Sequence, residues 1–255
     1  MISQQQIDQY HNDGYFVVRG LLSREEAEQY RRASHDLVER LSRTTNLDAA
    51  WGSGKAAVAD AEDTVIMHCH NVQFYDAIFT RLLVDERFTS IAADLLGTEN
   101  IELHHNKMFI KPPEKGAPFP MHQDQPYFPF ANHTMTAAIF HFDDAPLEKG
   151  CLRVVPGSHK LGPLPHDPEG GHHLPFAEYP VESATPIPAE AGDVLFFNYL
   201  CIHGSGVNTS NEARTTLLIQ FRDPEDEPLE DTHRSRGQGM MLRGINPKTA
   251  YTGLG

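Results

Sequence analysis

Near residue 100 the sequence changes from helix-like periodicity to short strand-like segments, and this change restricts the fold more than any other feature. Two segments before it have the apolar periodicity of helices that pack one face against a core. One begins at the capping box Ser23-x-x-Glu26, in which each side chain can accept the other residue's backbone N–H, and it continues to Leu41. The other covers residues 85–96 and ends at Gly97, a common residue at helix C-termini.

After residue 100, short stretches of β-favouring residues alternate with turns rich in proline and glycine, such as KPPEKGAP. The candidate strands are Ile101–Ile110, Thr134–Phe142, Cys151–Val155, Asp193–Phe197 and Thr215–Phe221. This pattern predicts a mainly β sandwich or barrel, flanked by N-terminal α-helices. We expect a loop over residues 45–64, which are small and polar. Residues 223–255 lack periodicity, so three alternatives are possible for them: a lid, a docked tail or a mobile end.

The length of 255 residues fits a single domain, 1–255, and the net charge of −14 restricts its partners. An acidic surface repels phosphate backbones and anionic membranes, so we expect neither nucleic acid nor a membrane surface as a partner. The three cysteines have no paired spacing, which argues against disulfides and against a thiolate zinc site. A polar N-terminus and the absence of a long apolar run predict a cytoplasmic protein. The oligomeric state stays open.

Three residues form a candidate metal site. His122 and Asp124 are two positions apart, so in an extended backbone both side chains point to the same side. His203 follows the apolar stretch DVLFFNYL, which would carry it along a strand. Two histidines and one carboxylate are typical of non-haem Fe(II) oxygenases. The HxD pattern is weak evidence alone, because a chain with 15 histidines can contain it by chance.

Arg214 makes the metal interpretation more specific. It lies eleven residues after His203, and a strand pair joined by GSGVNTSNEA would bring it back near the metal. A guanidinium binds a carboxylate through two parallel hydrogen bonds, which is what the far end of a metal-chelated 2-oxoacid needs. The surrounding RTTLLIQF is mostly apolar, which favours a functional anion partner over a surface ion pair.

These residues lie in stretches that resemble the phytanoyl-CoA dioxygenase family of Fe(II)- and 2-oxoglutarate-dependent oxygenases. The matching stretches are HQDQPYFPF, EKGCLRVVPGSHK and GDVLFFNYLCIHGSGVNTSNEAR, within a resemblance over about residues 5–222. The resemblance implies a double-stranded β-helix, a jelly roll of the cupin-like class. It also implies that His122, Asp124 and His203 bind iron and that Arg214 binds 2-oxoglutarate.

Further co-substrate contacts are implied by the same resemblance. Gln123, Phe140 and Lys107 match positions that line the co-substrate pocket, and the His68–His70 region is a looser match.

The implied reaction is hydroxylation of a small organic molecule. Fe(II) is the cofactor, 2-oxoglutarate and O2 are the co-substrates, and succinate and CO2 are released. Asp124 disfavours halogenation, because related halogenases lack this carboxylate. The alternative is a metal-binding jelly roll that is not an oxygenase, such as a cupin-like isomerase or a binding protein. Three basic residues near the end of this acidic chain are Arg234, Arg236 and Arg243. We expect them to lie on a solvated surface. The other hypothesis is a loop that closes over an anionic substrate.

Overall fold

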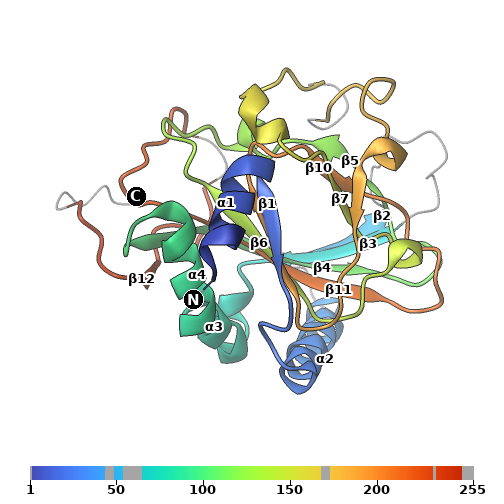
Figure 1. Cartoon of the computed structure of the whole chain (residues 1–255). Helices are drawn as coiled ribbons and strands as arrows, with labels where there is room; N and C mark the ends of the chain where they lie inside the picture. The colour runs from blue at the N-terminus through green and yellow to red at the C-terminus, as the bar shows by residue number, and fades with distance from the viewer. Residues whose placement is uncertain (1, 44–48, 54–64, 168–172, 232–233, 249–255) are drawn as a thin grey trace.

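The computed structural model describes residues 2–43, 49–53, 65–167, 173–231 and 234–248, which form two curled antiparallel sheets with helices outside (Figure 1). The larger sheet has the order β1-β9-β6-β11-β4-β3-β2, and β12 also pairs with β4. Its strands are β1 (Tyr15–Val18), β2 (Ala49–Ser53), β3 (Val65–His70), β4 (Ile101–Lys111), β6 (Thr136–His141), β9 (Val194–Asn198), β11 (Arg214–Arg222) and β12 (Met241–Arg243).

The smaller sheet has the order β5-β10-β7-β8 and faces the larger sheet. Its strands are β5 (Phe119–His122), β7 (Leu152–Val154), β8 (Thr185–Ile187) and β10 (His203–Ser205). Two curled antiparallel sheets that face each other form the double-stranded β-helix, or jelly roll, that was expected. Within the described residues, short 3-10 helices lie between these elements: η1 (Val72–Phe74), η2 (Gln125–Tyr127), η3 (Leu147–Lys149), η4 (Ser158–Leu161) and η5 (Val181–Ser183).

Helices cover the outer side of the larger sheet. They are α1 (Gln4–Asp13), α2 (Arg24–Leu41), α3 (Ala77–Leu83) and α4 (Glu86–Leu96). The capping box at Ser23 is present, and α4 ends at Gly97 in the left-handed conformation, as the sequence predicts. Both helices therefore begin or end at the residues that satisfy their free backbone groups.

Strand β11 shows how the larger sheet separates core from cavity. Leu217, Ile219 and Phe221 pack into the core with the helices, whereas the even-numbered residues between them face the other way and line a cavity. This alternation follows from the two-residue period of a strand. The centre of the core is Phe88 of α4, whose ring lies 5.3 Å from that of Phe140 and 5.5 Å from that of Phe221, centroid to centroid.

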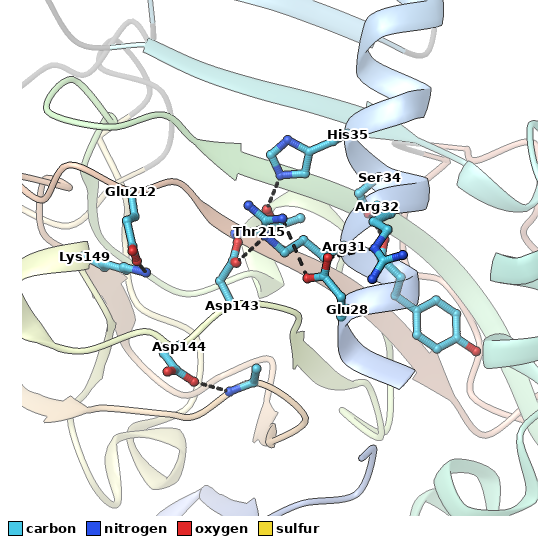
Figure 2. A network of polar contacts seen from close by, with 12 residues as sticks. Glu28, Arg31, Arg32, Ser34, His35, Asp143, Asp144, Lys149, Glu212 and Thr215 are labelled. Atoms are coloured by element: carbon cyan, nitrogen blue, oxygen red, sulfur yellow. Dashed lines mark hydrogen bonds and ion pairs between the residues drawn. The ribbon is translucent and has the colours of Figure 1, made fainter. Parts of the chain in front are cut away.

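Helix α2 is tied to the start of β11 by a polar network (Figure 2). The Arg31 Nε–H donates to Asp143 Oδ1 at 2.7 Å, and Asp143 Oδ2 accepts the backbone N–H of Thr215 at 2.8 Å. His35 Nε2 lies 2.9 Å from the Thr215 hydroxyl. The network thus fixes the backbone of the residue that follows Arg214.

Some sequence predictions need correction. The five candidate strands correspond to β4, β6, β7, β9 and β11, with shifts of one or two residues at their ends. The expected loop over 45–64 is wrong at Ala49–Ser53, which forms β2 by pairing with β3. The rest of that segment, 44–48 and 54–64, lies outside the described residues. Strand β2 pairs with the next strand, β3, but its sequence AAWGS is rich in alanine and glycine, which do not favour strands, so it was not predicted.

The segment after β11 lies against the larger sheet where it is described. Asp226 is fully buried and accepts the backbone N–H groups of Asn132 and Thr134. Strand β12 then pairs with the beginning of β4. These contacts dock the described residues after 222 on the body of the protein, although their sequence has no periodicity.

Replacing Phe88 with alanine is expected to destabilise the protein by about 3–5 kcal/mol, because it removes a fully buried ring and leaves a cavity among other aromatic rings. Urea unfolding followed by circular dichroism measures the loss. Leu161→Ala is the control, because that side chain is 61% exposed and its replacement should change the unfolding free energy by less than about 0.5 kcal/mol. Equal effects in the two variants would contradict the assigned core.

Candidate metal and co-substrate site

His122, Asp124 and His203 come together at one end of the space between the sheets. Asp124 Oδ1 lies 3.4 Å from His122 Nε2 and 3.7 Å from His203 Nε2, and the three donor atoms are all within 4.8 Å of one another. Two donors bound side by side on one ion at about 2.1 Å are about 3 Å apart, so a small shift would close the site. Among the described residues, this is the one group of three or more potential ligands that converges.

The backbone reaches this arrangement differently from the expected extended path. His122 is the last residue of β5 and pairs with His203 of β10. Asp124 has helical backbone angles, φ −78° and ψ −23°, at the start of η2, and its N–H donates to the Tyr199 carbonyl at 2.9 Å. The side chains of His122 and Asp124 therefore converge through a tight turn after the strand and not through strand alternation.

Both imidazoles are oriented by backbone carbonyls. His122 Nδ1 lies 2.7 Å from the Pro120 oxygen, and His203 Nδ1 lies 2.9 Å from the Cys201 oxygen. A carbonyl only accepts, so each Nδ1 carries a proton and each Nε2 is turned toward Asp124. Burial lowers the pKa of His203 to about 4, which keeps this ring neutral at physiological pH. Burial opposes but does not cancel the effect of Asp124 and of the Pro120 carbonyl, which raise the pKa of His122, so a divalent metal that binds there would displace a proton from its Nε2.

Gln220 positions Asp124, the third candidate ligand, and no pattern in the sequence predicted this contact. Its Nε2–H donates to Asp124 Oδ2 at 2.6 Å, while Asp124 Oδ1 faces the two imidazoles. Gln220 is fully buried on β11, between His105 of β4 and Ala137 of β6. Burial alone would raise the pKa of Asp124, but the imidazoles and this amide hold it below its usual range. The carboxylate is thus ionised and fixed with one oxygen toward the metal position.

Arg214 is the first residue of β11 and is 2% exposed. Its Nη1–H donates to the Gly150 carbonyl, and its Nε–H has no partner. Among the described residues, no carboxylate lies within the 4 Å of an ion pair with this guanidinium. Burial lowers the pKa of Arg214 to about 10, so the group is still charged at neutral pH. A buried guanidinium in this state is suited to an anion from outside the chain.

A cavity of about 750 Å³ joins these groups, and both sheets line it. The three triad residues, Arg214 and Gln220 all border it. β10 and β11 were expected to pair with each other, but they lie in different sheets. Arg214 therefore reaches the cavity of His203 from the opposite wall. Asp124 is the one carboxylate among the described lining residues.

The other predicted co-substrate residues separate into two groups. Lys107, His68 and His70 border the cavity, from β4 and β3. Gln123 does not: its amide binds the backbone of Gly162, Leu164 and Leu200. 

Phe140 is also away from the cavity lining, because it faces the helices and packs on Phe88. The co-substrate roles of Gln123 and Phe140 remain predictions that rest on the resemblance alone.

Of the three arginines after β11, two border the cavity and one does not. Arg234 and Arg236 border the cavity, and Arg234 pairs with Asp231. Arg243 pairs with Glu99 at 2.8 Å, outside the cavity.

Comparison with known proteins identifies the family. The model of the family described as phytanoyl-CoA dioxygenase matches residues 10–216. The chain belongs to the phytanoyl-CoA dioxygenase family. Its relatives include the peroxisomal phytanoyl-CoA dioxygenase of Bos taurus, 28% identical over 88% of this chain and 69% of the relative. The methylphosphonate hydroxylase of Gimesia maris is 28% identical over 99% of this chain and 95% of the relative.

Solved structures support the fold. The non-heme alpha-ketoglutarate-dependent epimerase SnoN from nogalamycin biosynthesis aligns with a TM-score of 0.71 at 23% identity, over 94% of this chain and 98% of that one. This member of the phytanoyl-CoA dioxygenase family is accordingly a 2-oxoglutarate-dependent dioxygenase that uses iron(II), 2-oxoglutarate and O2. The family favours this activity over the alternative of a cupin-like isomerase or binding protein. No helix of the described part of the chain is long and apolar enough to span a bilayer.

Replacing Gln220 with alanine is expected to weaken Co(II) binding about tenfold to a hundredfold, because Asp124 loses the group that orients it. Calorimetric titration of the metal-free protein with Co(II) measures this change without turnover. Asn106→Ala is the matched control: it removes another buried amide of the same sheet, one that binds Gln73 and the backbone of Val72. If both variants bound Co(II) as the unaltered protein does, Gln220 would have no positioning role.

Proposed function

We propose that the protein hydroxylates a C–H bond of a small organic molecule and converts 2-oxoglutarate and O2 to succinate and CO2. His122, Asp124 and His203 hold the iron, and Arg214 binds the distal carboxylate of 2-oxoglutarate. When bound, iron(II) and 2-oxoglutarate supply the activation of O2, with one oxygen atom entering succinate and the other entering the product as a hydroxyl group.

The observation that carries this proposal is Arg214. The Arg214 guanidinium is buried, borders the metal cavity and has no acidic partner among the described residues. A metal-binding jelly roll that binds no 2-oxoacid does not need such a group. Leaving such a charge without a partner is costly, so an anion bound at that place offsets the cost. 2-Oxoglutarate fits because one end can chelate the metal while the other end carries a carboxylate for the guanidinium.

The protein contributes in two ways: it positions the metal and the co-substrate, and it keeps water away from the reacting centre. His122, Asp124 and His203 would hold iron(II) with three protein ligands and would leave positions open for a chelating 2-oxoacid. Ile139, Leu218 and Phe197 form an apolar part of the cavity wall. Such a wall limits water at the reacting centre and strengthens the charge interactions of Arg214.

Asp124 directs the reaction toward oxygen transfer. With iron bound, its carboxylate would occupy the ligand position that a halide needs, and Gln220 keeps this carboxylate oriented. Hydroxylation is therefore favoured over halogenation at this site.

The proposal is tested by adding 2-oxoglutarate to the Fe(II) protein without oxygen and recording the visible charge-transfer band of the chelate. We expect a saturable band in the unaltered protein. Arg214→Leu should require about tenfold to a hundredfold more 2-oxoglutarate, because charge-assisted hydrogen bonds to the carboxylate are lost.

Arg153→Leu is the matched control for this titration. Arg153 also donates to backbone carbonyls, those of Glu182 and Ala184, but it lies outside the cavity. Its replacement should leave 2-oxoglutarate binding unchanged. A missing band in the unaltered protein would refute the proposed function, and equal 2-oxoglutarate affinity in Arg214→Leu would refute the role of that arginine.

A further inference from the structure

His141 is a buried imidazole at the end of β6. It is the last residue of that strand and is 1% exposed. Neither Nδ1 nor Nε2 of its ring has a hydrogen-bond partner among the described residues. Most buried side-chain nitrogens in proteins do have one, because the water that they lose on folding must be replaced. This ring is therefore a candidate for a contact that forms when a ligand binds.

The ring faces the space between the two sheets. Phe140 and Phe142, its neighbours in the sequence, pack into the core with the helices, whereas Ile139 borders the cavity. Side chains of a strand alternate between its two faces, so His141 lies on the same face as Ile139. Its partner on β11 is Thr216, which also borders the cavity. His141 does not itself border the cavity, so it can act there only through a neighbour.

Arg214 is the neighbour through which His141 can act. It lies two residues before Thr216 on β11, which makes it a diagonal neighbour of His141 on the same face. Diagonal neighbours are about 7–8 Å apart between Cα atoms, within reach of aromatic and long side chains. The Nε–H of Arg214 lacks a hydrogen-bond partner, as the ring of His141 does. A donor and an acceptor without partners therefore lie on neighbouring strands.

The ring of His141 is able to accept this hydrogen bond. Burial, and then the positive charge of Arg214, lower the pKa of His141 to about 4. A neutral imidazole has one N–H that donates and one nitrogen that accepts. At neutral pH the ring thus offers an acceptor to the Arg214 Nε–H.

An uncharged acceptor suits Arg214 better than a carboxylate would. The guanidinium makes one contact with the chain, through Nη1, which donates to the Gly150 carbonyl. One contact does not fix the plane of the group, whereas a second contact at Nε does, since the guanidinium is planar. A carboxylate at that place would also compensate the positive charge. An imidazole leaves the charge available to an anion in the cavity.

We propose that His141 is a positioning residue for Arg214. Its neutral ring accepts the Nε–H of the guanidinium, directly or through a single buried water molecule, and so turns the remaining N–H groups toward the distal carboxylate of 2-oxoglutarate. This inference rests on the proposed function and deepens it, because it concerns the co-substrate end of the same site.

The test uses the Fe(II) protein without oxygen and the charge-transfer band of a chelated 2-oxoacid. Two probes are titrated: 2-oxoglutarate, which has a distal carboxylate, and pyruvate, which has none. His141→Phe removes the acceptor but keeps a ring. It should weaken 2-oxoglutarate binding about tenfold, because a hydrogen bond to a charged group is lost. Pyruvate binding should change by less than about twofold, since pyruvate has no carboxylate for Arg214.

Two more substitutions at this position separate charge from shape. His141→Gln keeps an uncharged acceptor and should bind 2-oxoglutarate within about threefold of the unaltered protein. His141→Asp places an anion beside the guanidinium, so it should bind 2-oxoglutarate no more tightly than His141→Phe does.

His159→Phe is the matched control. His159 Nδ1 also lacks a hydrogen-bond partner among the described residues, but its ring packs against Gly14 and its Nε2 lies 3.2 Å from the His11 carbonyl. Its replacement should leave the binding of both probes unchanged.

A double-variant cycle shows whether His141 acts through Arg214. If it does, His141→Phe should add less than about twofold to the loss of 2-oxoglutarate affinity that Arg214→Leu already causes.

Any of four results would overturn the inference: unchanged 2-oxoglutarate affinity in His141→Phe, equal weakening of pyruvate, equal losses in His141→Phe and His141→Gln, or a full additional loss in the Arg214→Leu background. Each of them leaves the band of the unaltered protein, and hence the proposed function, intact. Binding of 2-oxoglutarate to His141→Asp as tight as to the unaltered protein would also overturn it. Absence of the band in the unaltered protein would instead refute the proposed function, and this inference with it.

Discussion

The buried guanidinium of Arg214 is the interaction on which the rest of the site depends. A charge at 2% exposure without an acidic neighbour raises the free energy of the folded protein unless something else compensates it. The fold tolerates it because the adjacent backbone is held by Asp143, which links β11 to Arg31 of α2. The helices outside the sheet thus support a charge inside it. A 2-oxoacid bound as we propose would supply the missing anion, so co-substrate binding and local stability would be linked.

Strand β11 brings structure and chemistry together through its two faces. One face packs against the aromatic core beneath α4. The other carries Arg214, which we propose binds 2-oxoglutarate, and Gln220, which binds the carboxylate of Asp124. The histidines come from the facing sheet, through the pairing of β5 with β10. The site is therefore assembled across two sheets, so a shift of one strand by one residue would turn the lining side chains into the core.

The sequence was sufficient to predict the residues with distinctive chemistry. His122, Asp124, His203 and Arg214 were predicted, and the structure brings them to one cavity. Gln220 was not, because a glutamine inside a β-strand pattern gives no signal until its partner across the sheets is known. The same holds for β2, which depends on its pairing with β3, and for the docking of the segment after β11, in which β12 pairs with β4. Local patterns predicted element types, whereas long-range contacts decided their partners.

A crystal structure of the protein grown without oxygen in the presence of Fe(II) and 2-oxoglutarate, with anomalous diffraction recorded at the iron edge, tests the central claim most directly. We expect one iron bonded to His122 Nε2, His203 Nε2 and Asp124 Oδ1, and the distal carboxylate of 2-oxoglutarate on the guanidinium of Arg214. Iron bound elsewhere, or a co-substrate carboxylate directed away from Arg214, would contradict it.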